Sequence, residues 1–318
     1  MMKSSDNVCR SYWKGIFSHP VFGVLLALFS CALLGSLYPF VKIGYAAFQI
    51  AGNDVPSILL FAGLRFALCG IVTVPLFSLS SKEPLLSKRS DITAVFLVTL
   101  FSIILHYAFT YLALAVGQSA KSAIIKQVGF LFLSCFSFLF IKSERFSPKK
   151  PICGALGFAG IIVTSFEGGF SFAAGDALIV AASLCSAIST ILTKNAVTRV
   201  SAVKLVAYSQ LIGGSFLCIC GLLAGGRLTH LDLRAVLVLL YICAATVIAY
   251  VLWNVCVKYN SVAKLAVIRF SVPLFAVAFS GILLKEQIFK WNYILALAII
   301  LFSILLNELS WKKKDTRF

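Results

Sequence analysis

Charged side chains are scarce in this sequence, and acidic ones are scarcer still. Only 12% of the 318 residues are charged, with 11 Asp and Glu against 28 Lys and Arg, whereas 60% are hydrophobic. Such a composition excludes an ordinary soluble domain and is typical of a membrane protein with several spanning helices. The basic excess does not indicate a nucleic-acid partner, because no basic run is interleaved with exposed aromatic residues and the cytoplasmic loops of membrane proteins collect Lys and Arg. We therefore expect the lipid bilayer as a partner and no nucleic acid.

Histidine is also rare, and no motif of a membrane-embedded enzyme is present. The three His residues are scattered, and the chain has no His-Glu-x-x-His pattern and no nucleophile with an adjacent base. The ten cysteines lie mostly inside apolar runs, where a thiol behaves as a small hydrophobe, and only Cys218 and Cys220 form a close pair. These absences predict a protein that is not an enzyme, binds no metal or cofactor, and has no disulfide framework.

Ten apolar stretches approach the length of about 20 residues that a bilayer crossing needs. They lie at 21–44, 57–79, 92–115, 119–141, 151–166, 175–196, 202–224, 233–256, 262–284 and 290–308. The predicted fold class is therefore an all-α polytopic membrane protein with ten transmembrane helices. Basic residues precede the first stretch, as in a signal peptide, but the stretch continues to about Phe40, which favours a retained first helix.

Two segments of the chain, 119–144 and 261–286, share one layout. Three chemically matched pairs are each separated by 143 residues: Lys121 with Lys264, Lys126 with Arg269, and Tyr107 with Tyr250. A repeat of this kind indicates an internal duplication. We expect a cytoplasmic N-terminal segment at 1–20, two five-helix repeats at 21–166 and 175–308, and a basic cytoplasmic tail at 309–318.

The distribution of Lys and Arg over the loops predicts the orientation of the chain in the membrane. With both termini cytoplasmic, the cytoplasmic segments hold eighteen of these residues and the opposite side holds four: Arg227, Arg234, Lys285 and Lys290. Because each half has five helices, the two halves then have opposite orientations. Inverted repeats are typical of transporters, in which the binding site lies at the repeat interface.

Six cations remain inside the apolar stretches: Lys42, Arg65, Lys121, Lys126, Lys264 and Arg269. Cations within a membrane are costly, so they normally face a partner or a wet cavity. Lys42, Lys121 and Lys264 lie near helix ends, where a long side chain can reach the interface. Arg65, Lys126 and Arg269 lie deeper, and no acidic residue falls in a helix interior. The deep cations therefore favour a cavity for an anionic group, although Arg65 is equally consistent with anchoring its helix through backbone carbonyls.

Aromatic side chains accompany these cations. Tyr250, Trp253 and Asn254 lie at positions i, i+3 and i+4, so they share one helix face. An aromatic belt at the membrane interface explains Trp253 and Asn254 equally well, whereas Tyr107 and Tyr250 lie farther in. His106 lies mid-helix, which suits either a proton relay or a neutral histidine bonded to a neighbouring helix.

Short motifs in both halves have a familiar order and spacing. The first half has Arg65 and Glu144, and the second half has Gly175-Asp176, the run Ala249–Asn254, Pro273 and Glu286. In this arrangement nearly the whole chain resembles the EamA-like, ten-helix branch of the drug/metabolite transporter superfamily. The resemblance implies a multi-pass protein of the bacterial inner membrane, with a central cavity lined chiefly by helices 1, 3, 4, 6, 8 and 9. Within this family, the chain resembles carriers of S-adenosylmethionine and S-adenosylhomocysteine in intracellular bacteria.

We therefore expect a carrier for a small metabolite with an anionic or zwitterionic end and a ring that can stack, with S-adenosylmethionine and S-adenosylhomocysteine as the first candidates. Lys126 and Arg269, together with Lys121 and Lys264, are the expected ligands of a carboxylate or phosphate. The other expected substrate-binding residues are Tyr38, Tyr107, Tyr250, Trp253 and Asn254.

The lack of acidic residues in helix interiors predicts a facilitator or exchanger rather than a carrier driven by protons. One alternative function is export of amino acids or of aromatic, drug-like metabolites, and the least favoured is that of an intramembrane enzyme. The small-molecule substrate is the expected partner besides the bilayer, and a homodimer is left open.

Overall fold

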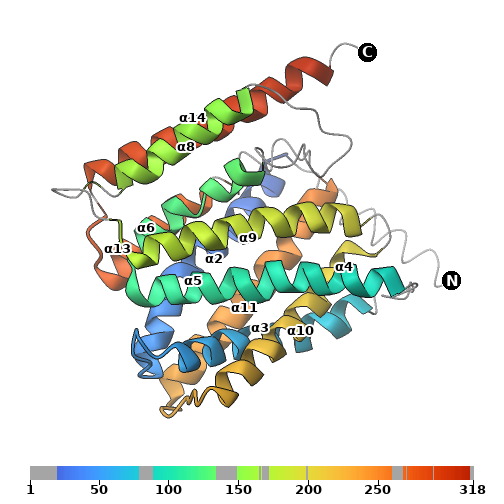
Figure 1. Ribbon diagram of the computed structural model, residues 1–318, viewed down its shortest axis with the longest axis vertical. Helices are drawn as coiled ribbons and strands as arrows, with labels where there is room; N and C mark the ends of the chain where they lie inside the picture. Colours follow the sequence, from blue (N-terminus) through green and yellow to red (C-terminus); the bar gives the residue numbers. More distant parts are fainter. Residues whose placement is uncertain are drawn as a thin grey trace.

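The computed structural model describes residues 20–78, 89–133, 149–164, 166, 172–197, 200–259, 268–269, 271–288 and 290–315. Every element formed by these residues is a helix (Figure 1). In chain order the helices are α2 (Pro20–Ala47), α3 (Val55–Ser78), α4 (Arg89–Thr99), η1 (Leu100–Ile104), α5 (Leu105–Val116), α6 (Ser119–Ile125), α8 (Lys149–Thr164), α9 (Ala174–Ala196), α10 (Ala202–Leu223), α11 (Leu233–Tyr259), α13 (Ser271–Leu284) and α14 (Trp291–Asp315).

The helices have the length and surface of membrane spans. Within the described residues, six are long and apolar enough to cross a bilayer: Phe22–Ala47, Val55–Leu76, Ile92–Val116, Ala174–Ala196, Lys204–Leu223 and Leu233–Trp253. Large apolar side chains such as Phe96, Ile219 and Phe302 are exposed on the outside of the bundle, where a soluble protein would present polar groups. The predicted class, an all-helical polytopic membrane protein, is confirmed at this level.

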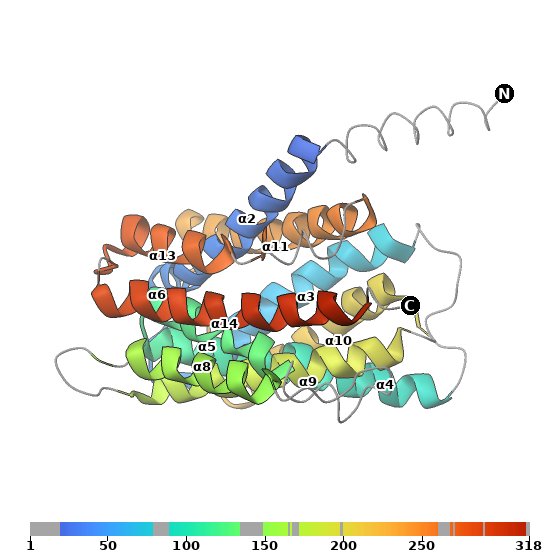
Figure 2. The ribbon, with the colours of Figure 1, turned by 90° about the horizontal axis from the view of Figure 1, so that it is seen from above.

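Pairs of helices from the two halves of the chain pack together. Figure 1 shows α3 beside α10 along one side of the bundle and α8 beside α14 along the opposite side, and the remaining helices lie between these pairs. Seen from above, α2 runs along α11 and α13 (Figure 2). The α3–α10 contact is close because glycines remove side chains from it. A Cβ atom on Gly63 would lie 2.3 Å from the backbone nitrogen of Cys218.

The third and fourth predicted helices are less regular than expected. The predicted stretch 92–115 is the run α4–η1–α5, in which the N–H of Leu105 bonds to the carbonyl of Leu100 and forms a π turn. The predicted stretch 119–141 does not form one continuous helix, because α6 ends at Ile125 and a turn at Lys126 and Gln127 follows. Both irregularities lie beside polar residues of the cavity described below. Counting apolar residues predicts the length of a span but does not predict such breaks.

Several predicted features fall outside the described residues. These are Lys264, Glu144, the loop at 82–88 and the chain ends 1–19 and 316–318, whereas residues 309–315 of the predicted tail continue α14. Asn254 lies on α11, as predicted, and only its place on that helix is described.

Candidate functional site

A cavity of about 400 Å³ lies at the centre of the bundle. Its polar and aromatic lining comes from helices far apart in sequence. The described residues of this kind are Tyr38 on α2, Arg65 on α3, Ser102 on η1, His106, Tyr107, Thr110 and Tyr111 on α5, Lys126, Gln127 and Phe130 after α6, Ser186, Ser189 and Thr190 on α9, Tyr250 on α11, and Arg269. The cavity therefore gathers seven predicted residues: Tyr38, Arg65, His106, Tyr107, Lys126, Tyr250 and Arg269.

The charged side chains described in the cavity lining are all basic. Arg65, Lys126 and Arg269 line the cavity, and no Asp or Glu is among its described lining residues. The two ion pairs formed within the described part of the chain involve other cations, Lys42 and Lys121. Three basic side chains in a confined space without a carboxylate create a positive potential, which favours an anionic group of a solute.

Arg65 is held rigidly from two sides. It is 2% exposed, and its guanidinium donates to the hydroxyl oxygen of Tyr111 on α5 at 2.6 Å and to that of Thr246 on α11 at 2.7 Å. It also lies 4.7 Å from the centre of the Phe66 ring. Its partners are thus hydroxyls and aromatic faces, and not the backbone carbonyls that one of the two sequence-based alternatives named. The Nε atom has no hydrogen-bond partner within the described structure.

Lys126 lies at the break that follows α6, where side chains satisfy backbone groups near the end of the helix. The amide of Gln127 donates to the carbonyl of Ala123 at 3.2 Å, and the Ser183 hydroxyl of α9 donates to the carbonyl of Lys126 at 3.3 Å. The Lys126 ammonium contacts Nε2 of His106 at 2.5 Å and lies 3.5 Å from the Thr110 hydroxyl. Broken helices are tolerated inside membranes where they line a cavity, and transporters commonly build substrate sites from them.

Arg269 lines the cavity and contacts Trp253, one of the predicted aromatic residues of the site. Its guanidinium carbon lies 4.8 Å from the centre of the Trp253 ring. Trp253 is not among the lining residues of the cavity and packs instead near Ala27 and Cys256. The ring of Trp253 thus contacts Arg269 instead of lining the cavity, and stacking of Trp253 on a solute stays a prediction.

Tyr107 and Tyr250, which are 143 residues apart, meet at the cavity. Both side chains line the cavity with Tyr38. The Tyr107 ring also contacts two other rings. Its centre lies 4.1 Å from the ring centre of Phe66 and 4.4 Å from that of His106. The predicted location of these tyrosines deep in the bundle is thus what the structure shows.

Lys121 is not part of the cavity, which corrects its predicted role as a substrate ligand. Its ammonium donates to Oδ2 of Asp176 at 2.8 Å, and both side chains are buried. The same carboxylate oxygen accepts the N–H of Ala173 at the start of α9. Asp176 lies in the first turn of α9, and α6 packs against that end of the helix. The lysine therefore neither reaches the interface nor faces a solute.

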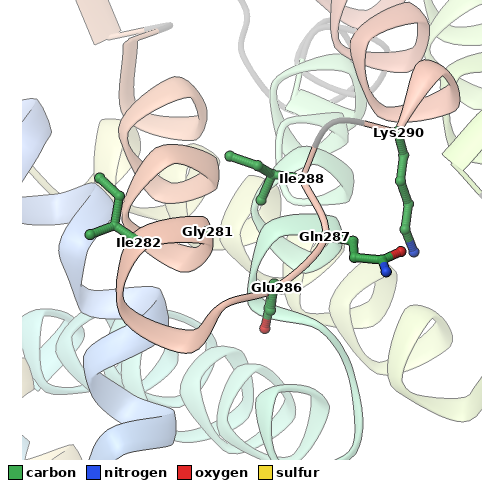
Figure 3. Close-up of a pocket in the computed structure, with 6 residues that line it drawn as sticks. All are labelled: Gly281, Ile282, Glu286, Gln287, Ile288 and Lys290. Carbon is green, nitrogen blue, oxygen red and sulfur yellow. The ribbon is translucent and has the colours of Figure 1, made fainter.

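Lys42 forms the second ion pair, with Glu286 at 3.3 Å. Glu286 also accepts the N–H groups of Ser119 and Ala120, so it caps the first turn of α6. Figure 3 shows Glu286 on the connection that follows α13, beside an open surface pocket lined by Gly281, Ile282, Glu286, Gln287, Ile288 and Lys290. This pocket shares no described residue with the central cavity.

Sequence reasoning missed the hydroxyl and amide side chains of the site. Ser186, Ser189 and Thr190 of α9 line the cavity and lie at i, i+3 and i+4, a spacing that places them on one helix face. That spacing was the feature of the sequence that could have indicated these residues as a polar face of the site. Ser and Thr are common in spanning helices, however, and their spacing does not say whether the face points to a cavity or to a neighbour. Tyr111 and Gln127 were missed as well.

Membrane-spanning helices around a polar, positively charged cavity define this chain as a membrane transport protein. It belongs to the EamA-like transporter family, whose model matches residues 21–166 and 173–308. The chain also resembles one solved crystal structure with a TM-score of 0.61 and 17% identity, covering 92% of this chain and 98% of the other, which shows the fold alone. The family consists of transporters, consistent with the prediction that the protein is not an enzyme.

Curated relatives agree with the family and are distant. An uncharacterized transporter, YetK of Bacillus subtilis, is 26% identical over 302 residues, which is 85% of this chain and 87% of the relative. A probable amino-acid metabolite efflux pump of Escherichia coli is 25% identical, covering 91% of this chain and 96% of the pump. A pump of the same description from Salmonella typhimurium is 26% identical, with 83% and 87% covered.

Proposed function

We propose that this protein is a facilitator or exchanger of the bacterial inner membrane for a small metabolite that carries a carboxylate or phosphate and a ring. The observation that carries the proposal is the cavity itself, where Arg65, Lys126 and Arg269 meet without an acidic side chain among the described lining residues. Its volume of about 400 Å³ is within the range of about 300–1,000 Å³ typical of small-molecule sites.

The lining also suits the uncharged parts of such a solute. Tyr38, Tyr107 and Tyr250 offer ring faces, and Thr110, Gln127 and Ser189 offer hydroxyl and amide groups for an amino or hydroxyl substituent. Because Arg65 is already bonded to Tyr111 and Thr246, Lys126 and Arg269 are the cations left to contact the solute directly. An arginine binds a carboxylate through two parallel hydrogen bonds.

Two substrate classes follow from this lining. S-adenosylmethionine and S-adenosylhomocysteine have the required carboxylate and a stackable adenine. Of the two, S-adenosylhomocysteine suits the cavity better, because it lacks the extra positive charge of the sulfonium, which the three basic side chains repel. Amino-acid metabolites are the second class, favoured because two relatives are described as probable amino-acid metabolite efflux pumps.

We further propose that the fold consists of two five-helix repeats of opposite orientation. The α3–α10 contact supports this arrangement. A Cβ on Gly63 would meet the Cys218 nitrogen, and one on Gly214 would meet the Ala67 nitrogen, both at 2.3 Å. Gly63 and Gly214 are 151 residues apart, as are Ala67 and Cys218, so exchanging the two helices maps one contact onto the other. The packing of α2 on α11 has a similar counterpart in that of α9 on α5.

Uptake into proteoliposomes tests the proposed function. Labelled S-adenosylmethionine, S-adenosylhomocysteine and an aromatic amino acid would each be compared in vesicles with and without protein. An exchanger should take up external label faster when the vesicles hold S-adenosylhomocysteine, and collapsing a proton gradient should change the rate of that exchange little. Uptake that is no faster than in protein-free vesicles for every anionic or zwitterionic solute would refute the proposal.

A further inference from the structure

With Lys126 taken as the ammonium, one polar contact in the cavity determines which nitrogen of His106 carries the ring proton. Nζ of Lys126 lies 2.5 Å from Nε2 of His106, and Nδ1 of the same ring lies 3.2 Å from the carbonyl oxygen of Ser102. A carbonyl only accepts hydrogen bonds, so Nδ1 carries the ring proton. An ammonium only donates, so Nε2 is the unprotonated acceptor. The pair therefore holds a single positive charge on Lys126 beside a neutral histidine.

The fold brings the two residues together at two helix irregularities. Ser102 lies in the π turn η1, and His106 follows in the first turn of α5. Lys126 lies at the break after α6, 20 residues further along the chain. Single π turns inside helices are uncommon and are frequent at functional sites. The stacked ring of Tyr107 further restricts the orientation of His106.

A second proton on His106 would place two cations in contact. The other titratable groups around the cavity add to this repulsion or are neutral: Arg65 from α3, Arg269, the tyrosines Tyr38, Tyr107, Tyr111 and Tyr250, and Cys185 of α9, which lies near Lys126. No carboxylate is among the described residues that line this space, and the described parts of α4 and α10 contribute no lining residue. The compensating negative charge is therefore expected to come from the solute.

We propose that the His106–Lys126 pair is a proton-linked anion receptor, in which a carboxylate or phosphate enters the cavity together with one proton. The proton goes from water to Nε2 of His106, the Lys126 ammonium turns from the ring to the anion, and the net charge of the cavity stays constant. The proposal rests on the anion site proposed above and adds the proton to it. Because linkage is reciprocal, the anion raises proton affinity by the factor by which the proton raises anion affinity. In exchange, one proton enters with one anion and leaves with the other.

The first measurement needs no ligand. After His19→Gln and His230→Gln, His106 is the only histidine of the chain, and nitrogen NMR of the labelled ring in lipid nanodiscs reports which nitrogen is protonated. The expected form is protonated at Nδ1 and unprotonated at Nε2, with a changed Nε2 signal in Lys126→Met. A ring protonated at Nε2, or an imidazolium in the absence of anions at neutral pH, would overturn the proposal.

The second measurement uses benzoate, a ring-bearing carboxylate that stays ionised between about pH 6 and pH 8. Its affinity should rise as the pH falls, by up to about tenfold per pH unit for one linked proton. His106→Gln keeps an acceptor near Nε2 and cannot take up the linked proton, so its benzoate affinity should depend on pH much less steeply than that of the parent. His230→Gln, in an exposed loop, should retain the dependence.

Two results would count against the linkage. A parent protein with pH-independent affinity, or a His106→Gln variant with the parent's dependence, overturns it. If benzoate does not bind at any pH, the anion site itself is what fails, and the ligand-free tautomer still decides whether the pair exists.

Discussion

At the scale of single residues, the basic side chains of the membrane region divide into two kinds. Lys42 and Lys121 pair with Glu286 and Asp176, which belong to neighbouring helix ends. Arg65, Lys126 and Arg269 contact hydroxyls, a histidine and aromatic rings. The first kind joins helices, and the second kind supplies the charge of the cavity, so substitutions in the two sets should affect different measurements.

Replacing Asp176 by Asn should destabilise the protein without acting on the cavity. The amide keeps an oxygen for the N–H of Ala173 but leaves the Lys121 charge buried without its carboxylate. Removing one partner of a buried ion pair costs about 3–5 kcal/mol, which thermal unfolding in detergent would detect. The double variant Lys121→Gln with Asp176→Asn has no unpaired charge and should recover most of the loss. A double variant as unstable as the single one would show that the pair does not act in this way.

Lys126→Ala and Arg269→Ala should each weaken substrate binding by about 1.5–3 kcal/mol, the usual scale for a hydrogen bond to a charged group. Their folded yield should be largely retained, because neither side chain has a carboxylate partner among the described residues. Lys290→Ala, in the separate surface pocket, is the matched control and should bind normally. Normal binding by both cavity variants would mean that these cations are structural.

Residue patterns predicted part of this division. The depth of Lys126 and Arg269 in apolar stretches led to the prediction of a cavity, while Arg65 was left open between that cavity and a structural anchor. All three line one cavity in the structure. The acid that pairs with Lys121 is 55 residues away, and its distance in sequence gave no sign of the contact. Lys121 and Lys126 are five residues apart, which places them on different sides of a helix, so their matching repeat positions did not imply a common role.

At the scale of helices, apolar length was the reliable signal. The bounds of α2, α3, α9, α10 and α11 fall within three residues of the predicted stretches. The π turn at 100–104 and the break at Lys126 were not predicted, because apolar length does not report such irregularities. The break at Lys126 also has a tertiary partner, the Ser183 hydroxyl. These are also the places where backbone irregularity positions the cavity residues Ser102, His106 and Lys126.

The contact between α3 and α10 gives a prediction at this scale. Ala in place of Gly214 would put a Cβ 2.3 Å from the Ala67 nitrogen, a backbone atom that cannot move alone. Overpacking typically costs about 1–3 kcal/mol, whereas the same change in an open helix is favourable by about 1 kcal/mol. A lower midpoint of thermal unfolding is therefore expected. Phe216→Leu, at a half-exposed position of α10, should change the midpoint little. An unchanged or raised midpoint for Gly214→Ala would contradict the close approach.

At the scale of the whole molecule, the structure fixes which loops share an end of the bundle. The Ser57 hydroxyl donates to the carbonyl of Arg227 and accepts its N–H, so the first turn of α3 meets the loop after α10. Helix α9 is 23 residues long and its start contacts α6, so its C-terminal end lies one full helix length away from that contact. Charge alone predicts which end faces the cytoplasm, with eighteen basic residues expected on one side and four on the other.

Cysteine labelling of intact cells tests this orientation. Asn53→Cys, in the loop before α3, and Thr229→Cys, in the loop after α10, should react with a membrane-impermeant thiol reagent added outside. Val197→Cys, just after α9, should react only after the cells are permeabilised. The described native cysteines are buried or half-buried, so their background should be low. The reverse labelling pattern would invert the topology, place the basic loops outside and reverse the direction in which the cavity is loaded. Equal labelling of all three positions from outside would contradict the spanning of α9 itself, because Val197 is separated from the start of that helix by its full length.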